Sequence, residues 1–190
     1  MPQVGSNDFK AGMKVELDGE PHTIVGVEFV KPGKGQAFTR TKLKHVMTGR
    51  VIEKNFKSGE KLDLADVEEA KMRMLYKEGD GVVFMNDVTY DQVTVPLTVI
   101  DDKEPYMMED TLYDLVFYKG NVVDVIPPTF LNMTIVETAP GARGDTASGR
   151  VLKPAKTDTG ATIQIPIFIE EGELVKVDTR TNEYVSRVKE

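Results

Sequence analysis

Lys34 stands between two glycines in the run Pro32-Gly33-Lys34-Gly35. Proline fixes φ at the first corner of a turn, and we expect Gly33 to supply a positive φ at the second. No side chain flanks Lys34, so its amine can extend outward into a narrow site. The run is not a phosphate-binding P-loop, because Gly35 follows the lysine where Ser or Thr is needed and no helix follows. An ordinary solvated turn is the alternative interpretation.

Basic side chains surround this turn. Residues 29–57 carry eight Lys and Arg and a single acid, Glu53. Four of these cations would supply phosphate contacts that fix the orientation of a bound RNA. They are Lys31, Arg40, Lys42 and Lys44. A solvated basic face is the alternative, but the excess of cations favours contact with nucleic acid.

The residues that most enzymes and metal sites need are scarce. The sequence has no cysteine, which excludes disulfides, thiolate metal sites and cysteine catalysis. His22 and His45 are the only imidazoles, too few for a triad or a metal set, and we interpret them as structural or surface residues. The carboxylate pairs Asp101-Asp102 and Glu170-Glu171 fit solvated loops. We therefore expect no catalytic residue, no metal and no bound cofactor.

The net charge of −7 is distributed unevenly. Residues 1–63 carry 11 Lys+Arg against 8 Asp+Glu, a net of +3; residues 64–128 carry 5 against 14, a net of −9; and residues 129–190 carry 8 against 9, a net of −1. A basic segment followed by a strongly acidic one indicates separate modules with different neighbours.

The elements that must position these side chains are mostly strands. Short runs of Val, Ile, Thr, Phe and Tyr are punctuated by Gly, Pro, Asn and Asp, which predicts an all-β protein of small barrels. We place three domains at residues 1–64, 65–127 and 128–190. In the first, an SH3-like barrel, strands are expected at 14–17, 23–30, 36–45 and 50–56.

The second and third domains both fit the OB pattern of a small five-stranded barrel. In the second, we expect strands at 67–76, 82–85, 115–118 and 122–126, strand and turn over 87–94, and a helix at 103–112. Pro127-Pro128 then marks a stiff link. In the third, we expect strands at 130–137, 162–169, 174–178 and 184–188, with a Gly-rich stretch from 140 to 149.

Targeting signals are not evident. There is no run of 18 apolar residues, so we expect no membrane span. The N-terminal residues lack the apolar core of a signal peptide. We expect a cytoplasmic protein.

Two motifs resemble a known family. Residues 28–38, EFVKPGKGQAF, resemble the loop of bacterial elongation factor P of the lysine-tip type. Near the C-terminus, Lys153-Pro154-Ala155, Gly160 and the run 163–172 are similar to the family signature K-x-A, four residues, G, then an apolar-x-V-P run ending at G. Ile165 stands where Val is usual. Segments 144–146 and 178–187 also resemble the family, so the resemblance spans the whole chain.

The resemblance implies a fold and a role. The fold is three small β-barrel domains in an L shape, with a KOW-like N-terminal domain followed by two OB-fold domains. The role is that of a monomeric elongation factor on the 70S ribosome. It lies between the P and E sites, against ribosomal RNA and beside peptidyl-tRNA, including prolyl-tRNA. There it stimulates peptide-bond formation when consecutive prolines stall the ribosome.

The resemblance also implies functions for single residues. Lys34, supported by Pro32, Gly33 and Gly35, would carry a covalent modification, β-lysylation or a related hydroxylation. It would be added by an enzyme resembling a lysyl-tRNA synthetase, and would position the CCA end of the P-site tRNA. The resemblance also implies RNA contacts in the last domain, from Gly144, Asp145 and Thr146 at the E-site codon region and from Tyr184 and Arg187 at the anticodon stem.

Other interpretations stay open. Tyr184 fits a strand residue in a barrel core equally well. A general RNA-binding protein built from similar barrels would share the basic segment without needing the glycine-flanked lysine. A paralogue within the family would carry a different residue at the tip of the loop. The intact Lys31–Gly35 sequence argues against this interpretation.

Overall fold

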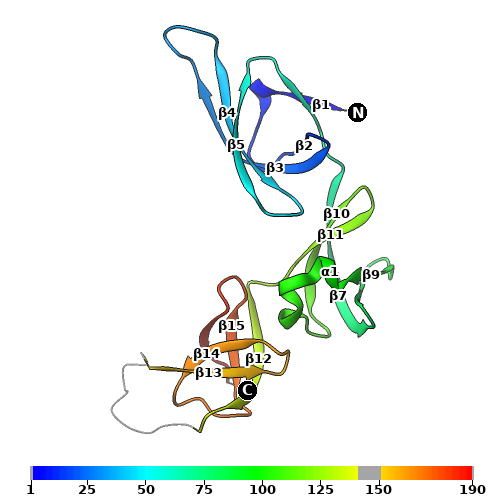
Figure 1. Ribbon diagram of the computed structural model, residues 1–190. Coiled ribbons are helices and arrows are strands. Elements are labelled where there is room, and N and C mark those ends of the chain that lie inside the picture. Colours follow the sequence, from blue (N-terminus) through cyan, green and yellow to red (C-terminus); the bar gives the residue numbers. More distant parts are fainter. Residues whose placement is uncertain (1, 141–150, 190) are drawn as a thin grey trace. The chain divides into compact units, whose positions relative to one another are not determined.

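The computed structural model describes residues 2–140 and 151–189, and strands make up most of its regular structure (Figure 1). Helical turns are short in this part of the chain: η1 spans Ser6–Asp8, α1 Leu97–Ile100 and η2 Asp101–Tyr106. The chain divides into two compact units. The first unit is Met1–Ala70 with Leu115–Asp124, and the second is Lys71–Asp114 with Val125–Glu190.

The N-terminal sheet is a four-stranded antiparallel sheet in the order β2-β3-β4-β5. Its strands are β2 Lys14–Leu17, β3 Glu20–Val30, β4 Phe38–His45 and β5 Val51–Lys57. These confirm the four predicted strands to within three residues. A two-stranded sheet joins β1 Gln3–Gly5 to β6 Lys61–Asp63, and neither strand was predicted because three residues show no period. The core between them is Phe9, Val15, Leu17, Ile24, Leu43 and Phe56.

The middle sheet has five strands in the order β11-β10-β7-β8-β9. They are β7 Val67–Glu78, β8 Gly81–Met85, β9 Gln92–Pro96, β10 Leu112–Tyr118 and β11 Asn121–Ile126. The strands predicted over 67–76, 82–85, 115–118 and 122–126 are confirmed. Val82, Phe84, Val95 and Leu115 are among its fully buried side chains.

The helix predicted over 103–112 is wrong. Helical structure comes earlier, in α1 and η2, and ends at Tyr106. The reason lies in Tyr113 of β10, whose hydroxyl accepts a hydrogen bond from the Met108 amide at 2.8 Å and donates one to the Tyr106 carbonyl at 2.5 Å. A side chain therefore satisfies backbone groups that a longer helix would have paired within itself.

The C-terminal sheet also has five strands, in the order β14-β13-β12-β15-β16. They are β12 Phe130–Thr138, β13 Leu152–Thr157, β14 Thr162–Pro166, β15 Leu174–Asp178 and β16 Glu183–Arg187. The strands predicted over 130–137, 174–178 and 184–188 are confirmed; the one over 162–169 ends three residues early, at Pro166. Buried residues such as Met133, Ile163, Ile165 and Val175 form its core.

Strand β13 was not predicted. The residues that it turns inward are Lys153, Ala155 and Thr157, which do not form a recognisable apolar alternation. The buried Lys153 amine donates to the Ala139 carbonyl, so its charge is solvated by the backbone.

In the described part of the chain, no helix has the length and hydropathy that crossing a membrane requires.

Candidate functional site

Lys34 lies in a loop that extends beyond the N-terminal sheet. The last paired residues of β3 and β4 are Val30 and Phe38, so residues 31–37 connect the two strands without ladder hydrogen bonds (Figure 1). Lys34 is exposed, and it makes no hydrogen bond or ion pair with any residue in the described ranges. Its amine is therefore free to reach another molecule.

The turn in this loop differs from the predicted one. Positive φ belongs to Gly35, at 103°, and not to Gly33. The prediction that Gly33 supplies the left-handed corner is wrong, because a seven-residue loop reverses direction more gradually than a four-residue turn. A Cβ at Gly33 would have nothing within 4 Å, so this glycine leaves open space beside Lys34.

Strand β4 arranges the predicted basic residues on one face. Thr39, Thr41 and Leu43 are buried. Because successive side chains of a strand point to opposite sides, the intervening cations share the outer face. They are Arg40, Lys42 and Lys44. Lys31 precedes the strand and is exposed in the loop.

Arg40 differs from the other cations on this face because it forms ion pairs. Its guanidinium lies 3.2 Å from Glu28 and 3.7 Å from Glu53. Glu28 is directly opposite Arg40 in the β3–β4 ladder, a partnership that depends on register and that sequence analysis missed. Lys42 and Lys44 have no ion-pair partner within the described ranges, so they are the freer cations of this face.

An apolar hollow of about 520 Å³ lies at the base of the loop. It is lined by Asn7, Phe29, Val30, Lys31, Ala37, Phe38, Thr39 and Ser58. Phe29 is 60% exposed, and the Arg40 guanidinium lies 5.9 Å from the Phe38 ring centroid. Exposed aromatic rings beside cations can stack on an unpaired base. Sequence analysis missed Phe29 because an aromatic residue in an apolar strand looks like part of the core.

The predicted RNA-contacting residues of the third domain lie in different surroundings. Tyr184 is partly buried and packs against the C-terminal core, as a strand residue in a barrel would. The Arg187 guanidinium lies 3.1 Å from Glu173 and 4.8 Å from the Phe168 ring centroid. Gly144, Asp145 and Thr146 fall outside the described residues.

The two histidines are buried in the N-terminal sheet. His22 and His45 are opposite each other in the β3–β4 ladder, and their ring centroids are 4.9 Å apart. Within the described ranges, no group of three or more metal-ligating side chains is arranged to hold a metal ion.

Comparison with known proteins places all three parts of the chain in one family. Models of the elongation factor P KOW-like domain, OB domain and C-terminal domain match residues 5–62, 67–125 and 131–187. Elongation factor P 2 of Protochlamydia amoebophila is 57% identical over 188 residues, 99% of each chain. Elongation factor P 2 of Chlamydia trachomatis is 56% identical over the same length and coverage.

A more distant relative and a solved structure agree. Elongation factor P of Natranaerobius thermophilus is 46% identical over 186 residues, 98% of each chain. The structure of translation initiation factor 5A from Methanococcus jannaschii matches at a TM-score of 0.51 and 25% identity, covering 66% of this chain and 94% of that one.

A KOW-like domain followed by an OB domain, in a chain whose relatives over nearly its full length are elongation factors, defines a translation factor rather than an enzyme. The chain belongs to the elongation factor P family. The predicted all-β class, with KOW-like and OB domains, is confirmed.

Proposed function

We propose that this protein binds the 70S ribosome between the P and E sites, beside peptidyl-tRNA, and stimulates peptide-bond formation where consecutive prolines stall translation. In this proposal Lys34 positions the CCA end of the P-site tRNA. The observation that carries it is the place of Lys34: exposed, without a partner in the described ranges, and on a loop that extends past the last β3–β4 pair.

A positioning role fits the chemistry of this loop. Proline is a slow nucleophile, and restricting the motion of the tRNA end that must react with it raises the rate by removing entropy from the barrier. A cation can hold a phosphate backbone without taking part in proton transfer. The described residues that line the hollow at the loop base include no imidazole or carboxylate, a composition that favours binding over acid–base catalysis.

Modification of Lys34 would extend its reach. β-Lysylation would add a second amine to the tip, and the open space at Gly33 leaves the lysine accessible to an enzyme resembling a lysyl-tRNA synthetase. The exposed cations Lys31, Lys42 and Lys44 would contact phosphates of the acceptor stem or of ribosomal RNA and set the direction of the loop.

The test is in vitro translation of a reporter containing consecutive prolines. We expect wild-type protein to restore synthesis and Lys34→Ala to lose most of this effect. Lys10→Ala, which removes another exposed lysine of the same domain, serves as the matched control and should act like wild type. Mass spectrometry of the protein from its native source should show an added group on the peptide containing Lys34. Equal rescue by Lys34→Ala and wild type would refute the proposal.

A further inference from the structure

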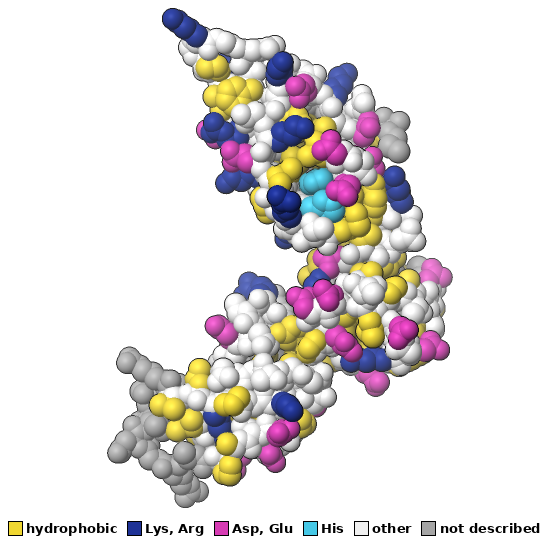
Figure 2. All heavy atoms as spheres, viewed as in Figure 1, with side chains coloured by type: hydrophobic (Ala, Val, Ile, Leu, Met, Phe, Trp, Pro, Cys, Tyr) yellow, Lys and Arg dark blue, Asp and Glu magenta, His cyan; other side chains and the backbone are white. Residues whose placement is uncertain are grey.

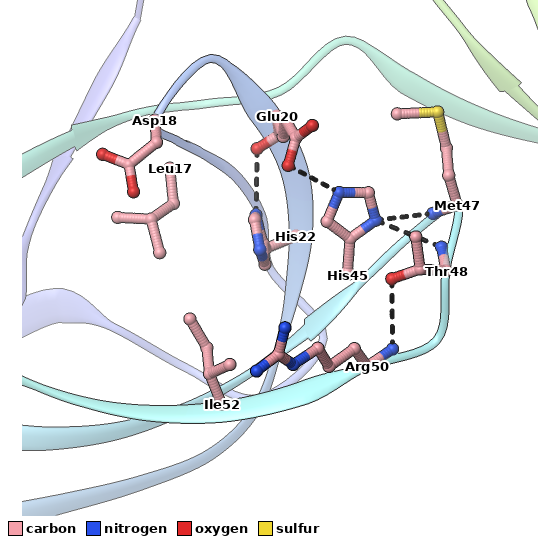
Figure 3. A pocket seen from close by; sticks show the side chains of 9 residues that line it. All are labelled: Leu17, Asp18, Glu20, His22, His45, Met47, Thr48, Arg50 and Ile52. Carbon is pink, nitrogen blue, oxygen red and sulfur yellow. Dashed lines mark hydrogen bonds and ion pairs between the residues drawn. The ribbon is translucent and has the colours of Figure 1, made fainter.

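A second hollow lies at the opposite end of the β3–β4 hairpin from Lys34. The ladder runs from the pair His22 and His45 to the pair Val30 and Phe38, where the Lys34 loop begins. The hollow measures about 520 Å³ (Figure 3). It is lined by Leu17, Asp18, Glu20, His22, His45, Met47, Thr48, Arg50 and Ile52. The proposed tRNA contacts at the loop use none of these residues.

The hydrogen-bond network assigns a tautomer to each histidine. Nδ1 of His45 accepts from the backbone amides of Met47 and Thr48 at 3.1 and 3.2 Å. Its proton therefore sits on Nε2, which donates to the Glu20 carboxylate at 2.9 Å. His22 donates from Nδ1 to the Glu20 carbonyl at 2.9 Å, so in the neutral imidazole its Nε2 is an acceptor.

His22 contributes a ring nitrogen to this hollow. His22 is only 6% exposed, yet its Nε2 has no hydrogen-bond partner among the residues that the structure describes. This nitrogen is not closed off from solvent: Thr41 Oγ1 is the one unpaired side-chain polar atom that the described residues bury completely, and Figure 2 shows histidine side chains, in cyan, at the surface. It is therefore open to a donor from a ligand in the hollow.

Arg50 supplies the complementary group. Its guanidinium makes no ion pair or hydrogen bond with any described residue. Arg50 lines the same hollow as His22, Leu17 and Ile52 (Figure 3). The backbone amide of Arg50 donates to Thr48 Oγ1 at 3.3 Å, which anchors the turn that carries it. The hollow thus combines a planar donor fork, an unpaired imidazole nitrogen, carboxylates and apolar walls, as far as the described residues show.

We propose that this hollow binds a guanine base. Guanine presents two adjacent acceptors, O6 and N7, which match the fork of Arg50. Its N1–H and N2–H donors match His22 Nε2 and the carboxylates of Asp18 or Glu20. Leu17 and Ile52, which line the same hollow, offer apolar contacts to its flat ring. Adenine places an amino donor where Arg50 also donates, and the two carboxylates repel an isolated phosphate.

The base can come from a free guanosine nucleotide or from an unpaired guanosine in RNA. The experiment titrates the full-length, isotope-labelled protein with guanosine monophosphate and, separately, with adenosine monophosphate, and follows the amide signals of Met47 and Thr48 by NMR. Two single-stranded RNA oligonucleotides, identical except for one G replaced by A, form the second arm. Tighter binding of the G oligonucleotide than of the mononucleotide identifies RNA as the source; equal binding identifies the free nucleotide.

The variants test the two recognition groups. We expect Arg50→Gln to weaken guanosine monophosphate binding about tenfold or more, and Arg50→Lys to fail to restore it, because lysine keeps the charge but loses the fork. His22→Phe removes the acceptor and keeps a ring. If this variant fails to fold, the two Arg50 variants still test the proposal, because Arg50 is exposed. Lys10→Ala should bind like wild type.

Three results would overturn the proposal: no amide shift with any guanine-containing probe, equal shifts with adenosine and guanosine monophosphate, or wild-type binding by Arg50→Gln. These measurements use the isolated protein, so their outcome is independent of the polyproline assay.

Discussion

Arg40 and Lys42 lie two residues apart on the same face of β4, but their surroundings differ. Arg40 is held between Glu28 and Glu53. Lys42 instead extends over Gly26: its Cβ and Cδ lie 3.6 Å from the position that a Cβ on Gly26 would occupy. A phosphate can bind Arg40 only by competing with two carboxylates. Lys42 is therefore the stronger candidate for a phosphate contact.

This difference predicts different salt dependences for the two alanine variants. Lys42→Ala should reduce the slope of log affinity for ribosomes or RNA against log salt by about one, because one phosphate contact is lost. Arg40→Ala should change the slope less, since its charge is already balanced. Binding measured at several salt concentrations checks this, and equal changes in both variants would contradict it.

The two glycines that flank Lys34 also differ. Alanine at Gly35 must adopt a φ of 103°, which costs about 1 kcal/mol or forces the loop to shift. Gly35→Ala should therefore lower polyproline synthesis. Gly33→Ala meets open space and needs no left-handed conformation, so it should keep most activity and serves as the matched control. Rates of polyproline synthesis for the two variants compare them directly, and equal loss in both would argue against this account.

At the scale of the element, Tyr113 shows how one strand residue shapes the segment before it. Its ring is buried against Phe84 at 5.7 Å between centroids, and its hydroxyl bridges the backbone of Tyr106 and Met108. The end of η2 and the approach to β10 are therefore held by tertiary contacts rather than by helix propensity.

Burial raises the pKa of the Tyr113 phenol from 10.0 to about 12. The protonated phenol is favoured in the folded state, so its stabilising contribution is complete below about pH 10 and is lost as pH rises through about 12. We expect the free energy of unfolding of wild type to fall more steeply over this range than that of Tyr113→Phe. Denaturant unfolding at several alkaline pH values measures it.

Tyr90→Phe is the control for this prediction, because its ring is exposed in the β8–β9 loop. It should follow the wild-type pH profile. Parallel profiles for wild type and Tyr113→Phe would show that the buried phenol does not govern alkaline stability. At neutral pH, Tyr113→Phe should cost about 1–3 kcal/mol, because the Met108 amide loses its acceptor.

At the scale of the whole molecule, each compact unit joins residues far apart in sequence. In the first unit, the Glu16 carboxylate accepts a hydrogen bond from Tyr118 at 2.8 Å and lies 3.8 Å from the Lys119 amine. In the second unit, the Tyr106 hydroxyl donates to Asn182 at 2.5 Å. The compact units therefore do not coincide with continuous stretches of the chain.

Glu16→Ala should loosen the part of the β10–β11 hairpin that belongs to the first unit, Leu115–Asp124. The Lys119 amide donates to the Asp66 carbonyl at 3.1 Å, and we expect its hydrogen exchange to speed up as local opening becomes about 1–2 kcal/mol easier. Hydrogen-exchange mass spectrometry or NMR measures this. Glu60→Ala, an exposed acid of the same unit, is the control, and unchanged exchange in Glu16→Ala would mean that Glu16 does not hold the hairpin.

Local sequence determined most strands and the chemistry of the loop. Alternating burial, as in β4, and turn residues between strands are visible in a single segment, and so is a lysine between two glycines. Strand β13 was not predicted because its inward residues include Lys153 and Thr157. The alternation of apolar and polar residues on which strand prediction relies is therefore missing there.

Tertiary structure alone decided which side chains meet. The register of β3 and β4 places Glu28 against Arg40 and His22 against His45, and the fold brings the Tyr113 hydroxyl to the backbone at Met108. These contacts join positions that no local period relates, because a cross-strand neighbour depends on how two segments align. The β3–β4 register leaves Lys42 without the ion pairs that Arg40 makes in the described ranges, and it brings together the residues of the hollow that we propose to bind guanine. The contact of Tyr113 with the backbone sets the end of η2.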